Sequence, residues 1–374
     1  MSIENNQAAW LHAKAHPFTV SDAPIVKPAV GEILIRNRAV ALNPFDGVVQ
    51  TLGGLVTPWV TYPSILGSDV AGEVVEVGSC ASRFKVGDRV LGLALGIDKL
   101  ANRAAEGAFQ HYVILREDAA TAIPGFMQFE QASVLPLAIA TAACGLFLKD
   151  QLHLRPPVLG GQALLGKTVL IWGGSTSIGS CAIQLAVAAG YAVVTTASPK
   201  NFGYVQQLGA ELVFDYNEPN VVTSVVNALR EREVVGALAI TVGSGAPCID
   251  IVSQCAGPRI VSMASSPYAV DDAPLTRQLL WKVKRLPRLA AGFLGLALRA
   301  RLKGVAIRSI WGTALVKDAL GRLIFADFLG PALASGQLVP APPPMVVGNT
   351  LQDIPKAIAI LRRGVSAKKV VVSL

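Results

Sequence analysis

The sequence predicts an α/β protein that combines a doubly wound parallel sheet with a separate β-rich domain. In residues 31–123, short runs of partly alternating apolar and polar residues end at glycines, which is typical of strands joined by tight turns. From about residue 131, alanine-rich helical stretches alternate with strands rich in valine and isoleucine. The chain has 374 residues, 52% hydrophobic and 16% charged, which suits two or three folded domains and excludes a disordered protein.

The expected strands of the β-rich part cover residues 32–36, 72–78, 87–92 and 108–114. The clearest element of the second part is a βαβ unit, with a strand over 167–172, a helix over 178–189 and a strand over 191–196. Further strands are expected over 212–214, 237–242, 259–263 and 368–373. A βαβ unit of this kind implies a parallel sheet with helices on both faces.

Composition and spacing exclude several classes of protein. The net charge of +8 comes from dispersed Lys and Arg, and aromatic residues are 6%, so nucleic-acid binding is not expected. The longest uncharged run, 168–199, is broken by glycines, so no transmembrane span is predicted and membrane association is not expected. Five scattered cysteines and a start without a secretory pattern predict a cytoplasmic protein. No CxxC or HExxH spacing predicts a metal site.

A loop of glycine and hydroxyl residues, 173–179, joins the strand and the helix of the βαβ unit. Glycines let the backbone approach a pyrophosphate, and the helix N-terminus supplies unpaired N–H groups with partial positive charge. The alternative is a purely structural turn. The flanking strand and helix favour dinucleotide binding.

The end of the second strand indicates which dinucleotide is bound. NAD-binding folds usually place an acid there, about 20 residues past the loop, to bind the ribose 2′-hydroxyl. Residues 196–201 contain no carboxylate, whereas Lys200 with Ser198 and Asn201 would suit a 2′-phosphate. The sequence therefore favours NADPH, with a merely solvated Lys200 as the alternative.

Four segments together, residues 67–78, 84–92, 173–179 and 208–210, resemble the medium-chain dehydrogenase/reductase superfamily. Residues 135–147, 196–202, 214–216 and 364–369 are similar to the fungal trans-acting enoyl reductases that partner polyketide synthases. The resemblance implies a GroES-like catalytic domain over 1–135 and 330–374. It also implies a Rossmann NADPH-binding domain over 136–329, and an active site in the interdomain cleft.

The resemblance also assigns site residues. It places Thr141 near the nicotinamide and substrate, the alternative being a helical Thr that bonds its own backbone. Asn43 is the second catalytic candidate, although Asn43 and Asp46 also suit a turn that shapes the cleft. The implied cofactor contacts are Pro44, Ser175, Thr176, Ser177, Ile178, Ser198, Lys200, Asn201, Tyr216, Met263, Ala264, Val365 and Ser366.

Two departures from the family pattern matter. Asn43 and Ser68 stand at the positions of zinc ligands in the zinc-dependent branch, and neither is a plausible ligand, so a zinc-independent enzyme is expected. Without a Lewis acid, hydride transfer needs an acceptor activated by conjugation. In addition, Val48 replaces a lysine that many relatives carry.

These observations predict an NADPH-dependent reductase of a conjugated C=C bond, acting on a small-molecule or carrier-bound acyl chain of the polyketide type. A polyketide synthase carrier protein is the expected partner class. The alternatives are a quinone or enone reductase, a redox-neutral cyclase-like member of the family, which the Val48 departure motivates, and a non-catalytic NADPH-binding partner of a synthase.

A basic, apolar segment covers residues 277–308 and contains nine Lys/Arg and no Asp or Glu. Such a segment could lie on an anionic membrane, receive an acidic carrier protein, or cover the substrate cleft. Pro287 and Gly292 predict that it does not form one long helix.

Overall fold

The computed structural model describes residues 5–80, 83–270, 273–276 and 278–374, and it divides into two compact units. The first comprises Met1–Leu137, Val270–Trp281 and Val316–Leu374, and the second comprises Ala138–Ala269 and Lys282–Leu315. Relative to the expected domain ranges, segments 270–281 and 316–329 lie with the first unit. For residues 270–281 the reason is apolar packing, because Ala273 and Trp281 join a hydrophobic cluster with Val48 and Leu52.

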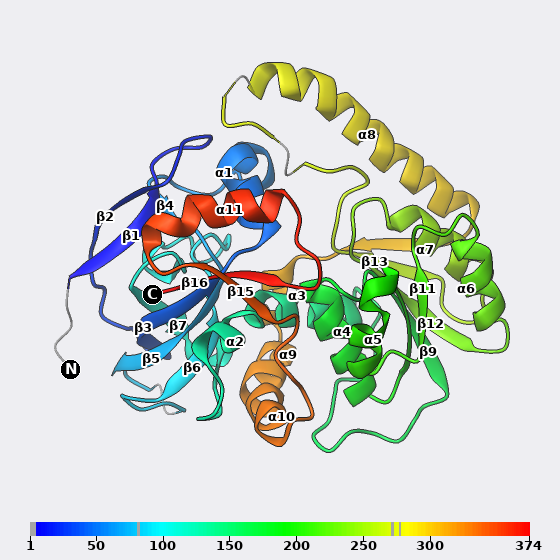
Figure 1. Ribbon diagram of the computed structural model, residues 1–374, viewed down its shortest axis with the longest axis horizontal. Helices are drawn as coiled ribbons and strands as arrows, with labels where there is room; N and C mark the ends of the chain where they lie inside the picture. The colour runs from blue at the N-terminus through cyan, green and yellow to red at the C-terminus, as the bar shows by residue number, and fades with distance from the viewer. Residues whose placement is uncertain (1–4, 81–82, 271–272, 277) are drawn as a thin grey trace. The chain divides into compact units, whose positions relative to one another are not determined.

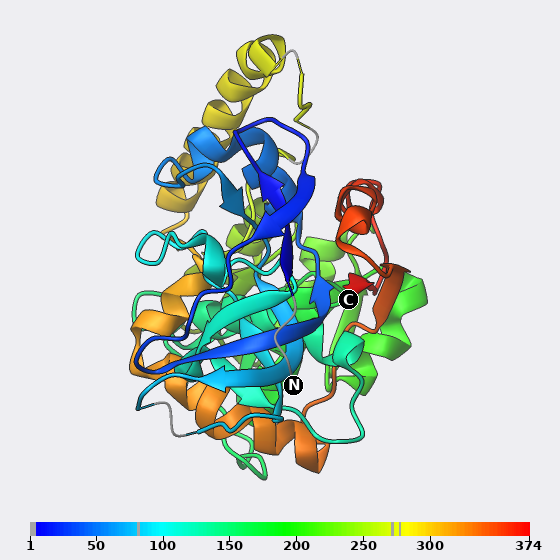
Figure 2. The same cartoon turned by 90° about the vertical axis from the view of Figure 1, so that its left-hand side faces the viewer.

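The first unit is built on a largely antiparallel seven-stranded sheet and a three-stranded sheet, whose blue and cyan strands run across Figure 2. The larger sheet has the order β15-β16-β3-β5-β6-β8 with β7 also paired to β3, and the smaller has the order β2-β1-β4. The strands are β1 (Asn6–Leu11), β2 (Thr19–Ala23), β3 (Glu32–Ala41), β4 (Ser64–Ile65), β5 (Asp69–Val77), β6 (Arg89–Leu93), β7 (Tyr112–Arg116), β8 (Ala120–Ala122), β15 (Pro344–Gly348) and β16 (Lys369–Ser373). The predicted β-rich part is therefore confirmed.

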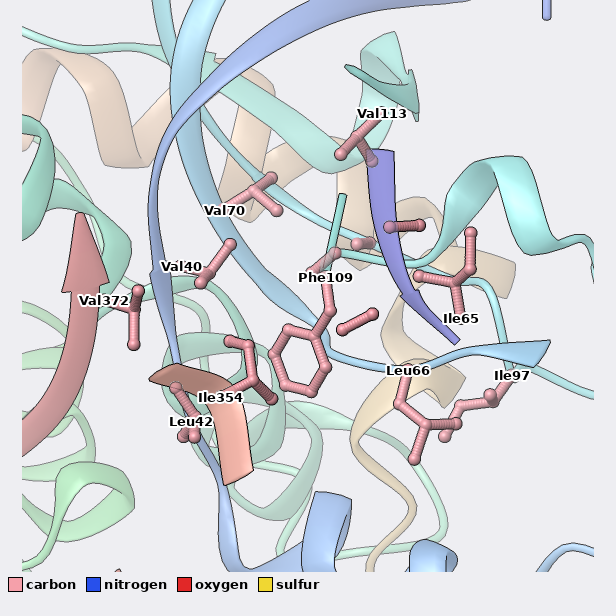
Figure 3. Close-up of a cluster of buried hydrophobic side chains, with 14 of the residues drawn as sticks. Val40, Leu42, Ile65, Leu66, Val70, Ile97, Phe109, Val113, Ile354 and Val372 are labelled. Atoms are coloured by element: carbon pink, nitrogen blue, oxygen red, sulfur yellow. The ribbon is translucent and has the colours of Figure 1, made fainter. Parts of the chain in front are cut away.

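The helices of the first unit are α1 (Pro44–Val56), α2 (Phe129–Ser133), α9 (Ala319–Arg322), a π-helical stretch (Leu323–Leu329), α10 (Gly330–Ser335) and α11 (Ile354–Arg362). α1 was not predicted, because Asn43 and Asp46 at its start suggested a turn. The core holds side chains from distant parts of the chain, including Val40, Phe109, Ile354 and Val372 (Figure 3). Burial of these side chains brings the C-terminal strand into the N-terminal sheet.

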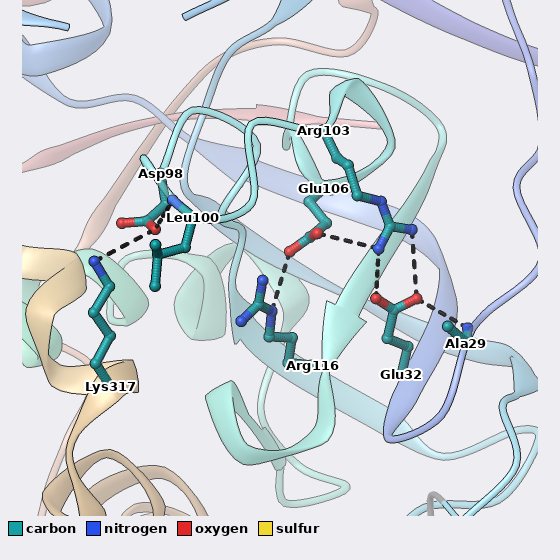
Figure 4. A network of polar contacts seen from close by, with 8 residues as sticks. All are labelled: Ala29, Glu32, Asp98, Leu100, Arg103, Glu106, Arg116 and Lys317. Atoms are coloured by element: carbon teal, nitrogen blue, oxygen red, sulfur yellow. Dashed lines mark hydrogen bonds and ion pairs between the residues drawn. The ribbon is translucent and has the colours of Figure 1, made fainter. Parts of the chain in front are cut away.

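A network of charged side chains ties β3 to β7 (Figure 4). Arg103 pairs with Glu32 at 2.6 Å and with Glu106 at 3.4 Å, and Arg116 also reaches Glu106 at 3.4 Å. Burial raises the pKa of Glu106, and the two guanidinium groups oppose that rise. The two arginines thus offset the desolvation cost of burying the Glu106 carboxylate, and the network has a structural role.

The second unit is a six-stranded parallel sheet with the order β11-β10-β9-β12-β13-β14. Its strands are β9 (Lys167–Trp172), β10 (Ala192–Ala197), β11 (Leu212–Asp215), β12 (Glu233–Ala239), β13 (Ile260–Met263) and β14 (Ala306–Ser309). The remaining helices are α3 (Pro136–Phe147), α4 (Ser177–Ala188), α5 (Phe202–Gln207), α6 (Val221–Leu229), α7 (Gly245–Val252) and α8 (Gln278–Leu302) (Figure 1). The order runs in two directions from β9, so the predicted doubly wound sheet is confirmed.

The prediction against one long helix in the basic segment is wrong, because α8 continues through Pro287 for 25 residues. Proline removes one backbone hydrogen bond, which leaves the carbonyl of Val283 without its usual partner, and Val283 lies on the exposed side of the helix where water reaches it. Gly292 packs against Tyr268, whose Cε2 would lie 2.5 Å from an added Cβ. Arg277 lies outside the described residues.

One helical stretch, Phe129–Phe147, is long and apolar enough to cross a membrane by length and composition alone. Because 78% of that window is buried inside the structure, it has the character of a core helix.

Candidate functional site

The glycine loop follows β9 and leads into α4 at the switch point of the sheet, where β10 and β12 flank β9 on opposite sides. Thr176 caps α4, because its Oγ1 accepts a hydrogen bond from the N–H of Gly179 at 3.0 Å. The same hydroxyl donates to the carbonyl of Gly173 at 2.8 Å, which closes the turn. Ligands in open α/β sheets bind at this place.

Close contacts explain why this loop contains glycine. A Cβ on Gly179 would lie 2.2 Å from the carbonyl oxygen of Gly173, and a Cβ on Gly174 would lie 2.3 Å from Oγ1 of Thr195. Gly173 has φ +101°, which glycine adopts at low cost. The tight turn leaves backbone N–H groups at the helix N-terminus available for a pyrophosphate.

Parallel pairing places most of the predicted cofactor residues at one edge of the sheet. β10 ends at Ala197 and is followed by Ser198, Lys200 and Asn201, whereas Tyr216 follows β11. Met263 ends β13 and is followed by Ala264, at the same carboxyl edge. Lys200 and Tyr216 are exposed, as contacts to a bound ligand require.

A carboxylate, Asp215, also lies at this edge, where it ends β11. The strand register pairs Ala197 with Asp215 of β11. Oδ1 of Asp215 accepts hydrogen bonds from the backbone N–H of Asn217 at 2.9 Å and from its Nδ2 at 3.0 Å. In the segment from Ser198 to Asn201, Lys200 is the charged residue and it is exposed, and its contact to a 2′-phosphate stays a prediction.

These residues fit a nicotinamide dinucleotide. The loop 173–176 and the first turn of α4 would hold the pyrophosphate, and the residues after β10 would hold the adenosine ribose. Ser175, Ser177 and Ile178 are partly exposed there. Thr141 lies on α3 and is buried, three residues before Cys144, whose thiol contacts the carbonyls of Trp311 and Gly312.

Asn43 belongs to a buried polar cluster in the first unit that sequence reasoning missed. Its Nδ2 donates to Asp69 at 2.8 Å, and its Oδ1 accepts from Nζ of Lys369 at 2.6 Å. Lys369 also pairs with Asp69 at 2.9 Å, and the other oxygen of Asp69 accepts from the backbone N–H of Leu137 at 2.6 Å. The side chains of Lys369 and Asp69 are 4% and 0% exposed.

Asp46 adds a second buried carboxyl group to the cluster, and Oδ2 of Asp46 accepts from the backbone N–H of Asn43 at 2.7 Å in a capping box. Burial raises the pKa of Asp46 to about 7. The hydrogen bond from Asn43 opposes that rise, the charge of Asp69 adds to it, and the charge of Lys369 opposes it. Asn43 and Asp46 thus help to shape this turn, and a catalytic role for Asn43 stays a prediction.

Comparison with known proteins places this geometry in a family. Residues 29–125 match the family model of the alcohol dehydrogenase GroES-like domain. The dehydrogenase pigH from Monascus ruber is 44% identical over 373 residues, with 100% of both chains covered. The chain is a medium-chain dehydrogenase/reductase. This medium-chain enzyme is an oxidoreductase, and members of its superfamily use nicotinamide cofactors.

Two further relatives of this medium-chain dehydrogenase/reductase carry enoyl reductase names. Trans-enoyl reductase himH from Aspergillus japonicus is 33% identical over 372 residues, covering 99% of this chain and 97% of its own. The CurK enoyl reductase is a structural neighbour with a TM-score of 0.71 and 20% identity, covering 99% of each chain. At that identity the likeness shows the shared fold.

Val48, where the family resemblance led us to expect a lysine, is buried in an apolar cluster. It packs with Leu52 of the same helix and with Ala273, and Trp281 lies against the cluster. An apolar side chain at position 48 thus serves packing against the segment Val270–Trp281.

The remaining predicted residues of this medium-chain enzyme lie in the first unit. Pro44 is the first residue of α1, and Val365 and Ser366 lie between α11 and β16. Their contacts to a cofactor stay predictions. Within the described ranges, no group of three or more His, Cys, Asp or Glu could hold a metal ion.

Proposed function

We propose that this oxidoreductase uses NADPH to reduce a conjugated carbon–carbon double bond in an enoyl thioester or an enone. The observation that carries the cofactor choice is the segment after β10, where Lys200 is exposed and the neighbouring Asp215 is bonded to Asn217. The names of the trans-enoyl reductase relatives support the reaction class. The dinucleotide, when bound, supplies a hydride to an electron-poor carbon.

The chain's own residues bind the cofactor and position the substrate. The first turn of α4 stabilises the pyrophosphate charge, and Lys200 with Ser198 binds the 2′-phosphate. Thr141 places a hydroxyl beside the reacting groups, where it positions the conjugated carbonyl or relays a proton. Asn43 holds the turn before α1 through Asp69 and Lys369. The substrate is a free or carrier-bound acyl chain of the polyketide type.

The cofactor choice is tested by titrating NADPH and NADH by calorimetry. NADPH should bind about one to two decades more tightly, since charge-assisted bonds contribute about 1.5–3 kcal/mol. Lys200→Ala should abolish the difference, whereas Lys149→Ala, at an exposed site after α3, should leave it unchanged. Equal affinities in the wild type would refute the assignment to NADPH.

The reaction is tested by incubating enoyl thioesters and enones, free and carrier-bound, with the protein and following product mass. Reduction gives a product heavier by two hydrogens that forms only with NADPH. Thr141→Val should lower turnover more than it weakens NADPH binding, whereas Thr223→Val, at an exposed site on α6, should change neither. A product isobaric with the substrate, formed equally without NADPH, would instead establish the redox-neutral, cyclase-like function.

A further inference from the structure

The outer face of α8 carries a continuous apolar stripe. Leu280, Val283, Pro287, Ala291, Leu294 and Leu298 follow one another at intervals of three or four residues, and all six are exposed. With 3.6 residues per turn, these intervals place them on one face of the helix. Leu280 is 62% exposed and Leu294 is 72% exposed. The exposed side of α8, the long yellow helix of Figure 1, is therefore apolar.

The opposite face of α8 already holds the helix in place. Leu296 and Ala300 are buried in the hydrophobic core of the second unit. Lys303 pairs with Asp250 of α7 at 2.9 Å, and Nε of Arg299 donates to the same carboxylate at 2.8 Å. Because these contacts come from the inner face, the fold does not need a leucine-rich outer face.

The charges beside the stripe are basic. Nine Lys/Arg and no acidic residue occur over 277–308. Lys284 and Arg301 are exposed on the same helix as the stripe. Lysine is depleted at protein interfaces, whereas a helix with an apolar face and flanking Lys/Arg is typical of membrane surfaces.

We propose that α8 lies on an anionic lipid surface, with its apolar stripe among the upper acyl chains and its flanking Lys and Arg against the headgroup phosphates. This inference goes beyond the proposed reductase activity and does not depend on it. The stripe could not be predicted from the sequence, because Pro287 suggested an interrupted helix. In an interrupted helix, the apolar residues before and after Pro287 would not share one face.

The test is co-sedimentation of the full chain with vesicles of phosphatidylcholine alone and of phosphatidylcholine mixed with phosphatidylserine. The protein should bind the mixed vesicles, and salt should weaken binding. The double variant Leu294→Asp/Leu298→Asp should lose at least about tenfold in affinity. Leu164→Asp, at an 83% exposed site elsewhere in the second unit, should bind normally. Lys284→Gln/Arg301→Gln should lose about fivefold in affinity for each positive charge removed.

Unchanged melting temperatures would show that the variants fold, because every substituted side chain is exposed. Failure to bind either kind of vesicle would overturn the proposal, and so would equal binding by the Leu294→Asp/Leu298→Asp variant. Sedimentation velocity provides the remaining comparison. A wild-type dimer that the same variant dissociates, without vesicle binding, would assign the stripe to a second copy of the chain and overturn the lipid assignment.

Discussion

Asp46 should make the stability of the first unit fall as pH rises. Its carboxyl group is 1% exposed, and burial raises its folded-state pKa to about 7 from the ordinary value of 3.8. A raised pKa means that the folded state holds its proton more tightly than the unfolded state does. The stabilisation is therefore complete below about pH 4 and is lost as pH rises to about 7.

The magnitude follows from the two pKa values. A difference of about 3 units, at about 1.4 kcal/mol per unit, corresponds to about 4 kcal/mol. The side-chain amide introduced by Asp46→Asn stays neutral at every pH, and its carbonyl oxygen can still accept the N–H of Asn43. The difference in unfolding free energy, variant minus wild type, should therefore increase by about 4 kcal/mol between pH 4 and pH 8.

The assay is urea unfolding of both proteins from pH 4 to pH 8, with hydrogen exchange of α1 reporting on the first unit. Comparing variant with wild type cancels the titration of other groups. Asp353→Asn is the control, because hydrogen bonds from Thr350 and Asn349 lower the pKa of Asp353. For this variant, the unfolding free energy relative to the wild type should not increase with pH. If the difference in unfolding free energy between Asp46→Asn and the wild type does not change from pH 4 to pH 8, the raised pKa of Asp46 is refuted.

Three further outcomes are expected. Gly179→Ala should weaken NADPH binding at least about tenfold by calorimetry, because its Cβ would lie 2.2 Å from a backbone oxygen, whereas Gly203→Ala, with nothing within 4 Å, should not. Val48→Lys should lower the free energy of unfolding by about 3 kcal/mol or more, because it buries an ammonium group in an apolar cluster, and Val86→Lys at an exposed site is the control. Elemental analysis should find no stoichiometric zinc, and a chelator should change neither melting temperature nor activity; one tightly held zinc per chain would contradict this.

Local patterns in the sequence determined the βαβ unit. The strand Lys167–Trp172 has the predicted bounds, and α4 and β10 lie within one residue of theirs, because periodicity and glycine placement act over a few residues. The short edge strand β14 was not predicted, since its four residues carry no clear alternation and the first three belong to the basic segment 277–308. α8 was missed because the rule for proline treats a helix in isolation. In the structure, Trp281 packs against an apolar cluster before Pro287, and Leu296 lies in a hydrophobic core after it.

The sequence by itself determined the fold class, the phosphate-binding loop and the basic residue after β10, all of which depend on neighbours in the chain. Only the tertiary structure showed that Asn43, Asp69 and Lys369 share one buried cluster, because 326 positions separate Lys369 from Asn43. β16 pairs with β3, which brings the start of the C-terminal strand beside the end of the N-terminal one. Pairing at that distance depends on the packing of the whole sheet, and the buried charges then determine how the turn before α1 is held.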